Sequence, residues 1–460
     1  MWTLDDTIAA ISTPIGEGGI GIVRMSGPEA RAILCKVFLP AVKDGQSPCT
    51  FEPQSHRLYY GHVIDPDTGI VVDEVLAVLM RAPRTYTRQD VAEIHCHGGI
   101  VPLRRTLELV LRQGARLAQP GEFTLRAFLN GRIDLAQAEA VLDIVRAKTE
   151  VSLRVAMQQL DGHISGQVRK IRSMLVEALA HLEAALDFPE DEIPPLDLAS
   201  VLAQAKEQIK ALLAQANQGM IYRHGVRTAI VGRPNVGKSS LLNALLRTSR
   251  AIVTPIPGTT RDTLEETLNL RGIPLCLVDT AGITKSTNII EKLGIERSRQ
   301  ALQQADLVLL VIDGSEPLRM EDFELAEAVR NKNVIVVVNK LDLPAAADAD
   351  SFLPEAKHVY LSALTGEGVN TLEDVIVETI FCGQVQTPDV PTISNPRHCA
   401  ILNRALVHIA DAERSYQAIC AADLTAVDLT AAINALGEIT GETASEDVLD
   451  LIFSNFCLGK

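Results

Sequence analysis

Aromatic residues are scarce in this sequence, at 4% of its 460 residues, and only one of them is a tryptophan. Ala, Leu and Val are abundant instead, which favours a large helical share. No apolar run approaches the ~20 residues that a membrane-spanning helix needs. The first residues, MWTLDDTIAA, also lack the basic and then apolar layout of a signal peptide. We therefore expect a protein that is neither secreted nor inserted in a membrane.

Cysteine is sparse as well, and its eight copies form neither a CxxC pair nor the spacing of a disulfide framework. Such usage is typical of a reducing compartment, so the sequence predicts a cytoplasmic protein.

Basic side chains are outnumbered, with 43 Lys and Arg against 58 Asp and Glu, for a net charge of −15. This balance disfavours attraction of the whole molecule to nucleic acid, because phosphate binding draws on clustered Lys and Arg. Any RNA contact would come from a local patch or from a second protein. The 47% apolar and 22% charged residues are ordinary for globular domains, and the length predicts about three of them.

The spacing of apolar residues changes along the chain. Residues 1–122 mix short β-like runs with Gly and Pro, and 123–220 show apolar residues at three- and four-residue spacing, typical of helices. In 221–382 short apolar runs alternate with helical stretches, which predicts a mostly parallel sheet covered on both faces. Residues 383–460 again show the apolar spacing that is typical of helices. We interpret the α/β unit as an insertion into a helical domain, whose two flanks pack together.

A phosphate-binding loop is predicted by GRPNVGKS, which begins at Gly232, follows a strand-like run and precedes a helix-like one. Its glycines let backbone N–H groups surround the phosphates, Lys238 adds a positive charge, and the hydroxyl of Ser239 suits Mg²⁺. The predicted loop contacts with nucleotide come from Asn235, Val236, Gly237, Lys238, Ser239 and Ser240.

Further motifs follow in the order expected of a Ras-like GTPase domain. DTAG places Asp279 to orient the metal and Gly282 to meet the terminal phosphate. In NKLD, the carboxylate of Asp342 can accept the two adjacent donors of guanine, which adenine lacks. The remaining predicted contacts are Thr280, Ala281, Asn339, Lys340, Ser362, Ala363 and Leu364. Together these motifs predict that the α/β unit binds GTP.

The catalytic step is less defined by the residues. TPIPGTTRD offers Thr259 and Thr260 as candidates to complete the Mg²⁺ shell. Ile283 stands where Ras-type GTPases carry the glutamine that orients water, so hydrolysis is catalysed otherwise or the protein is a slow switch. Two acids downstream, Glu291 and Glu296, are candidates for a catalytic role, although acids in a helix are more often solvated surface residues.

Two local patterns admit competing interpretations. The ending FCLGK places Cys457 where a prenylation signal has its cysteine, but Gly459 and Lys460 do not fit the aliphatic positions, so a final helix that frays is the other interpretation. In HCHGG, His95 and His97 share one strand face as zinc ligands can. No further ligands are suitably spaced, which favours a segment that lines a pocket.

With these motifs, the N-terminal GEGGIGIVRMSG, the segment PGEFTLRAFLNGRIDLAQAEAV and the final CLGK, the whole chain resembles the tRNA-modification GTPase MnmE (TrmE) family. The resemblance implies a folate-binding N-terminal domain and a helical domain interrupted by the GTPase domain. It also implies a homodimer that acts with a FAD-dependent partner, MnmG, on tRNA. Together they would install a (carboxymethyl)aminomethyl group at C5 of the wobble uridine from a tetrahydrofolate derivative.

For GTP hydrolysis, the resemblance implies a potassium ion in the role that an arginine finger has elsewhere. The implied K⁺ ligands are Asn235, Thr254, Ile256 and Thr259. Thr260 would then bind Mg²⁺ with Ser239, and Glu291 would orient the water network. The GTPase domains would pair across their nucleotide faces.

For folate, the resemblance implies Arg24, Glu93, Arg132 and Lys460. A pterin carries the same adjacent donors as guanine, so Glu93 can accept them, while the cations can hold carboxylates. Cys457 would lie near the one-carbon unit, with a possible catalytic part. This sequence departs from the family at Arg132, where many relatives have lysine, and in YTRQD, which begins at Tyr86. The main rival is a ribosome-assembly or other regulatory GTPase switch without one-carbon chemistry.

Overall fold

The computed structural model describes residues 5–41, 51–188, 194, 196–248, 266–278, 302–381, 393–417 and 422–460. The chain divides into two compact units. The first comprises Met1–Leu142 and Gly437–Lys460, and the second comprises Asp143–Pro255 and Thr259–Leu436. Among the described residues, every helix is too short or too polar to cross a bilayer.

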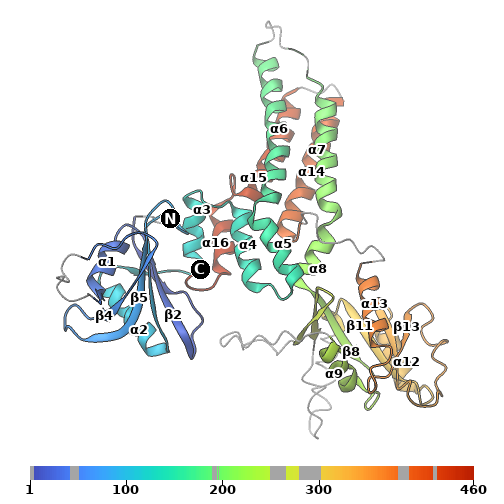
Figure 1. Ribbon diagram of the computed structural model, residues 1–460. Coiled ribbons are helices and arrows are strands. Elements are labelled where there is room, and N and C mark those ends of the chain that lie inside the picture. Colours follow the sequence, from blue (N-terminus) through green and yellow to red (C-terminus); the bar gives the residue numbers. More distant parts are fainter. Residues whose placement is uncertain are drawn as a thin grey trace. The chain divides into compact units, whose positions relative to one another are not determined.

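A seven-stranded sheet forms the larger part of the first unit (Figure 1). Its strands, in spatial order, are β3 (Phe38–Pro40), β4 (Arg57–Ile64), β5 (Val71–Met80), β6 (Val91–Gly98), β2 (Gly18–Ser26), β1 (Ile8–Ile11) and β7 (Arg116–Leu117). Neighbouring strands are antiparallel except β1 and β7, which are parallel.

Helices α1 (Ala30–Val37) and α2 (Ile100–Arg112) bury their apolar sides against the sheet. The alternation of strand residues sends every second side chain into this core. On β6, for example, Ile94 is fully buried, whereas Glu93 and His95 on either side of it are only partly covered. Glu93 and His95 therefore lie on the sheet face opposite the two helices.

The C-terminal helix of the chain belongs to the same unit. Helices α3 (Glu122–Leu129), α4 (Leu135–Arg146) and α16 (Glu446–Ser454) contribute to one apolar cluster. Phe453 and Phe456 pack there with Leu125 and Leu135. The last residues of the chain are thus held beside residues that precede them by more than three hundred positions.

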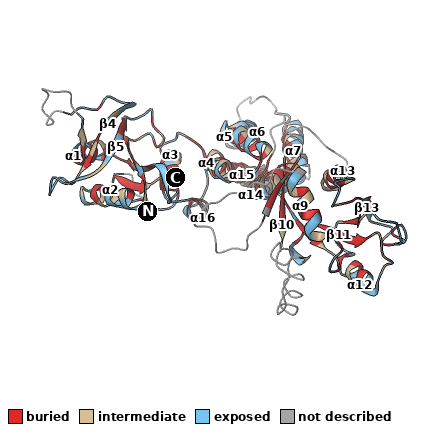
Figure 2. Ribbon diagram, turned by 60° about the horizontal axis from the view of Figure 1, so that its bottom comes forward, coloured by how far each residue is buried: buried red, intermediate tan, exposed pale blue. Residues whose placement is uncertain are grey.

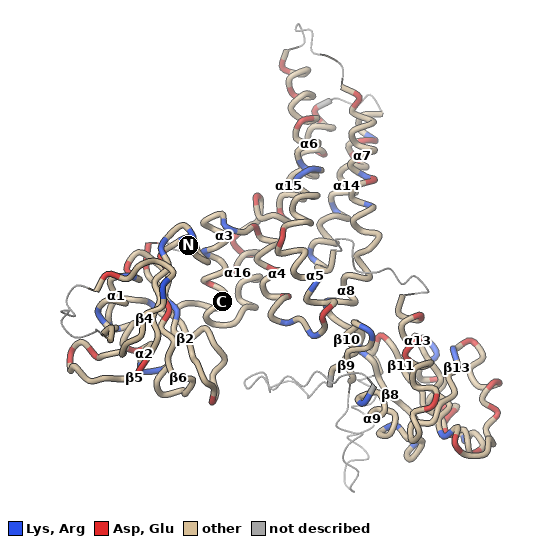
Figure 3. The backbone as a smooth tube through the Cα atoms, viewed as in Figure 1, with Lys and Arg blue, Asp and Glu red and all other residues tan. Residues whose placement is uncertain are grey.

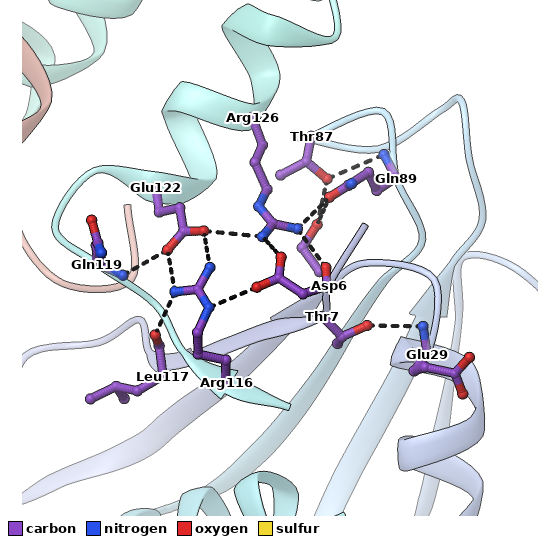
Figure 4. A network of polar contacts seen from close by, with 11 residues as sticks. Asp6, Thr7, Glu29, Thr87, Gln89, Arg116, Leu117, Gln119, Glu122 and Arg126 are labelled. Carbon is purple, nitrogen blue, oxygen red and sulfur yellow. Dashed lines mark hydrogen bonds and ion pairs between the residues drawn. The ribbon is translucent and has the colours of Figure 1, made fainter. Parts of the chain in front are cut away.

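A buried ionic network fixes α3 to the sheet (Figure 4). The guanidinium of Arg126, 1% exposed, contacts Asp6 at 2.5 Å and Glu122 at 3.0 Å, and Arg116 joins both acids. Burial alone would raise the pKa of Glu122, but hydrogen bonds from Arg116, the Gln119 amide and Arg126 more than offset it and hold that pKa below its usual value. Burial would raise the pKa of Asp6 as well, but its bonds to Arg116 and Arg126 lower it, so both acids are ionised at neutral pH. The buried pair of Arg126 and Glu122 is thereby compensated in charge.

A six-stranded sheet organises the GTPase part of the second unit. Its strands, in spatial order, are β13 (Lys357–Tyr360), β12 (Val334–Asn339), β11 (Leu307–Asp313), β8 (Val226–Val231), β10 (Ile273–Val278) and β9 (Glu266–Leu270). All pairs are parallel except β9 with β10. Figure 2 shows buried residues along β10 and β11, of which β11 is buried over its whole length.

Helices cover both faces of this sheet, as the continuous apolar runs predict. Alternate residues of β11 face two separate cores: Leu309 packs with α9 (Lys238–Thr248) and α13 (Val369–Ile380), whereas Leu310 packs with α12 (Met320–Val329). The predicted fold class, with mixed α/β, helical and P-loop GTPase parts, is confirmed.

In the helical part of the second unit, α7 (Leu198–Ala214) packs against both α6 (His163–Asp187) and α14 (Pro396–Gln417). Acidic and basic residues are interspersed along α6 and α7 (Figure 3), as expected for helices with one face in water. The helices of this part are α5 (Glu150–Leu160), α6 (His163–Asp187), α7 (Leu198–Ala214), α8 (Ala216–His224), α14 (Pro396–Gln417) and most of α15 (Ala422–Thr440).

Helix α5 joins this helical part to the GTPase sheet. Thr149 caps α5 by accepting from the Ser152 amide, and its hydroxyl donates to the carbonyl of Gly272 at 2.8 Å, in the β9–β10 turn. Gly272 has a φ of +94°, and a Cβ there would come within 2.5 Å of Val151. Val155 is part of the GTPase core itself. The turn between β9 and β10 is therefore seated directly on the start of α5.

Candidate functional site

The phosphate-binding loop lies between β8 and α9, at the carboxyl end of a central parallel strand. Gly232 and Gly237 have φ angles of +156° and +96°. A Cβ would lie 2.3 Å from the Val311 carbonyl oxygen at Gly232, and 2.1 Å from Asn339 Nδ2 at Gly237. Both positions therefore require glycine, for backbone conformation and for space.

The lysine of this loop is directed at the loop itself. Lys238 Nζ donates to the carbonyl oxygens of Gly232, at 2.7 Å, and Arg233, at 2.6 Å. Burial lowers the pKa of Lys238. The ammonium group is thus held inside the curve of the loop. A bound phosphate would compensate its charge fully, whereas the two carbonyl oxygens do so only in part.

The guanine-recognition motifs are bonded to the phosphate loop. Asn339, 3% exposed, donates from Nδ2 to the Val236 carbonyl at 2.8 Å and accepts at Oδ1 from the Ala363 amide at 3.0 Å. The buried hydroxyl of Ser362 donates to Asp342 Oδ1 at 2.5 Å. The three motifs that sequence places far apart therefore form one framework.

The candidate ligand site of the first unit centres on two strand neighbours. Arg24 on β2 and Glu93 on β6 are direct register partners, and Arg24 Nε donates to Glu93 Oε1 at 2.7 Å. The other carboxylate oxygen, Oε2, lies 3.2 Å from His95 Nε2. Burial would raise the pKa of Glu93, but the hydrogen bond from His95 and the charge of Arg24 outweigh it, so that this pKa is lowered.

The terminal turn of the chain reaches Arg24 on β2 and the end of β1. Arg24 Nη1 donates to the carbonyl of Gly459 at 3.3 Å, and the Gly121 amide donates to that of Cys457 at 3.4 Å. Gly459 has a φ of +85°, and a Cβ there would lie 2.5 Å from the Ile11 carbonyl oxygen. Lys460 is partly buried and Cys457 is exposed.

The contacts of Arg132 are with Tyr86 rather than with the Glu93 carboxylate. Its guanidinium lies 4.7 Å from the centre of the Tyr86 ring, and Nη1 donates to the Tyr86 carbonyl at 3.0 Å. The Tyr86 hydroxyl is bonded to Thr124, and Arg24 lies 5.9 Å from the Phe123 ring. Tyr86 packs in the same apolar cluster as Phe123, so these aromatic rings connect Arg132 with Arg24.

The comparisons with known proteins decide the family. The family model described as "MnmE helical domain" matches residues 135–457, and that described as "GTP-binding protein TrmE N-terminus" matches residues 7–132. The "tRNA modification GTPase MnmE" of Chloroflexus aurantiacus is 52% identical over 460 residues, covering 99% of this chain and 100% of that protein. The chain belongs to the MnmE family. The protein of the same name from Bacillus subtilis is 49% identical over 462 residues, with 99% and 100% covered.

Several residues predicted for the nucleotide site, some from its motifs and some from the family resemblance, fall outside the described residues. They are Thr254, Ile256, Thr259, Thr260, Asp279, Thr280, Ala281, Gly282 and Glu291. Of the implied metal ligands, the structure describes Ser239, in the first turn of α9, and Asn235, whose φ is +67°. An asparagine tolerates this left-handed conformation better than most residues.

The structure adds a residue that sequence reasoning missed in this MnmE-family chain. Arg233, inside the phosphate loop, donates from Nε to both carboxylate oxygens of Asp322 at 2.8 Å, and the two side chains are 6% and 1% exposed. Asp322 also accepts from the Arg319 amide at the start of α12. The loop is thereby anchored to a helix that none of the nucleotide motifs includes.

The two histidines of HCHGG engage different acids. His97 Nδ1 lies 2.6 Å from Asp73 Oδ1, and Asp73 also accepts from the His97 amide. The hydrogen bond and charge of Asp73 raise the pKa of His97. His95 contacts Glu93 instead, so the structure places His95, and not His97, at the candidate ligand site.

Proposed function

We propose that this chain is a GTP-hydrolysing tRNA modification enzyme that uses a folate one-carbon unit. With a FAD-dependent MnmG-type partner it would install a (carboxymethyl)aminomethyl group at C5 of the wobble uridine. The names of the MnmE relatives support GTP hydrolysis and tRNA as the substrate class. The observation that carries the one-carbon part is the meeting of the Arg24–Glu93 pair with the terminal turn at Gly459.

The residues of the nucleotide site fit GTP with Mg²⁺. The loop glycines leave backbone N–H groups accessible, Lys238 offers its charge to the phosphates, and the Ser239 hydroxyl would hold the metal with Thr260. Asp342 would accept the two guanine donors while Ser362 holds one of its oxygens. Bound K⁺ would neutralise the negative charge that develops on the phosphates during hydrolysis. Of the residues proposed to bind K⁺, Asn235 is the one that the structure describes.

The residues of the first unit fit a reduced folate. A carboxylate whose pKa is lowered stays ionised at neutral pH, and the Glu93 carboxylate can accept the adjacent N–H and NH₂ of a pterin. Arg24, Arg132 and Lys460 supply cations for the carboxylates of the folate tail. Cys457, exposed on the terminal turn, can approach the one-carbon unit.

The assembly that we propose is a cytoplasmic homodimer in which GTPase domains pair across their nucleotide faces. Ile283 offers no polar atom to orient water, so hydrolysis would depend on K⁺, on Glu291 and on this pairing.

GTP turnover measured in KCl and in NaCl tests the GTPase part. We expect turnover to be at least about tenfold faster in KCl, because an ion that replaces an arginine finger is worth a large part of the ~10³–10⁵-fold that such a finger supplies. Equal, negligible rates in both salts would instead favour a GTP-binding scaffold. Mass spectrometry of wobble uridines in a strain that lacks the protein tests the modification part.

A further inference from the structure

The imidazole of His95 lies beside the acid of the candidate ligand site. It stands on β6 two residues after Glu93, on the sheet face away from α1 and α2. Its register partners are Ile22 on β2 and Leu76 on β5. The side chains of His95 and Glu93 are 20% and 14% exposed. His95 is therefore flanked by two apolar neighbours, with its ring edge at the carboxylate.

The two oxygens of Glu93 have different partners. Oε1 accepts from Arg24 Nε at 2.7 Å, and Oε2 lies 3.2 Å from His95 Nε2. An ionised carboxylate has about four lone-pair positions, so each oxygen keeps the capacity for another donor. The terminal torsion of a glutamate is otherwise broad. A partner on each oxygen restricts that rotation, and a carboxylate fixed before binding loses less entropy when a ligand docks.

We propose that His95 is a positioning residue for Glu93 and a determinant of ligand specificity. By donating from Nε2 to Oε2, it sets the plane of the carboxylate for a ligand with two adjacent N–H donors, the class that includes the pterin of a reduced folate. The inference rests on the folate site proposed above and adds a residue that the resemblance did not implicate.

The Nε2–H tautomer of His95 is sufficient for this role, because a neutral imidazole with its proton on Nε2 donates to Glu93 Oε2. Burial would raise the pKa of Glu93, but the hydrogen bond from His95 and the charge of Arg24 outweigh it, so the carboxylate keeps its charge at neutral pH. A charged acceptor in a fixed plane is what two adjacent N–H donors require.

The experiment is calorimetric titration of the full-length protein with 5-formyltetrahydrofolate at neutral pH. His95→Leu removes the donor and is expected to weaken binding about tenfold, the usual size for a hydrogen bond to a charged group. His95→Gln places an amide donor near the position of Nε2 and is expected to restore binding to within about threefold of the wild type.

Matched controls separate the outcomes. His97→Leu lies on the same strand, where His97 contacts Asp73 rather than Glu93, and should leave the affinity unchanged. The thermal unfolding transition of the first unit reports that the His95 variants are folded. No binding by the wild type would overturn the folate proposal and this inference together. Binding by the wild type with equal affinity in His95→Leu, or a loss in His95→Gln as large as in His95→Leu, would overturn only the role of His95.

Discussion

Replacing Asp342 by asparagine is expected to lower the affinity for GTP by at least about 10³-fold. The carboxylate can accept both guanine donors, whereas an amide presents an N–H to one of them and leaves that donor unpaired in the site. The Ser362 hydroxyl, 2.5 Å from Asp342 Oδ1, fixes the orientation of this carboxylate. Xanthosine triphosphate, which has a carbonyl in place of the guanine amine, should gain affinity in the same variant. Titration with fluorescent nucleotides measures both changes.

Asp350→Asn is the matched control for this substitution. Asp350 is exposed and contacts the Tyr360 hydroxyl, outside the nucleotide framework. It should leave GTP affinity within about twofold, because surface substitutions rarely have larger effects. If Asp342→Asn bound GTP within tenfold of the wild type, Asp342 would not be the guanine-selecting residue.

Replacing Gly459 by alanine is expected to abolish wobble-uridine modification while GTP turnover in KCl is retained. The left-handed backbone at Gly459 costs an alanine about 1 kcal/mol. The larger effect is steric, because the new Cβ would lie 2.5 Å from the Ile11 carbonyl oxygen and 2.8 Å from the Ser12 Cα. The backbone at the end of β1 is hydrogen-bonded to β2 and cannot move aside cheaply, so the terminal turn would leave Arg24. Affinity for 5-formyltetrahydrofolate should fall by about 100-fold, the size expected when a charged partner loses its position.

Gly69→Ala provides the matched control. Its φ of +70° is close to that of Gly459, but a Cβ there would meet nothing within 4 Å. It therefore carries similar backbone strain without the clash, and folate affinity and modification should be unchanged. A loss in both variants would point to general destabilisation of the first unit rather than to displacement of the turn.

The nucleotide site was predictable because its chemistry is concentrated in short segments. A loop that wraps phosphate needs its glycines and its lysine within a few residues, and guanine selection needs an acid at the end of a buried strand. The positive φ angles at Gly232 and Gly237 and the bonds of Asn339 are what such motifs require. The alternation of apolar runs likewise predicted the parallel sheet, because strands buried on both faces have few alternatives.

Contacts between residues far apart in the sequence could not be predicted from it. Arg233 and Asp322 are 89 positions apart, and neither stands out, since an arginine in a loop and an acid in a helix are ordinarily solvated. Arg126 is a stronger case, because an arginine inside RAFLNGR is expected at the surface, yet it is 1% exposed. Its burial depends on Asp6, Glu122 and Arg116 together, and no local pattern records that combination.

The terminal turn could be predicted only in part. The ending CLGK and the resemblance that includes it predicted a role for Lys460, and the helical texture on both sides of the insertion predicted that the flanks pack together. The acceptor that meets Arg24, however, is the backbone carbonyl of Gly459. A main-chain atom has no signature in the residue type. The role proposed for His95 was hidden for a related reason. HCHGG favoured a segment that lines a pocket over a zinc site, but its spacing does not say which acid each histidine contacts.

The central claim is that the last residues of the chain complete a folate site that is separate from the GTPase machinery. Its most direct test is a strain whose only copy of the protein lacks Cys457–Lys460, assayed for modified wobble uridine by mass spectrometry and, with the purified protein, for GTP turnover in KCl. The account predicts unmodified uridine with turnover within about twofold of the wild type, because none of the nucleotide contacts lies in the deleted segment. Normal levels of modified uridine in that strain would contradict it.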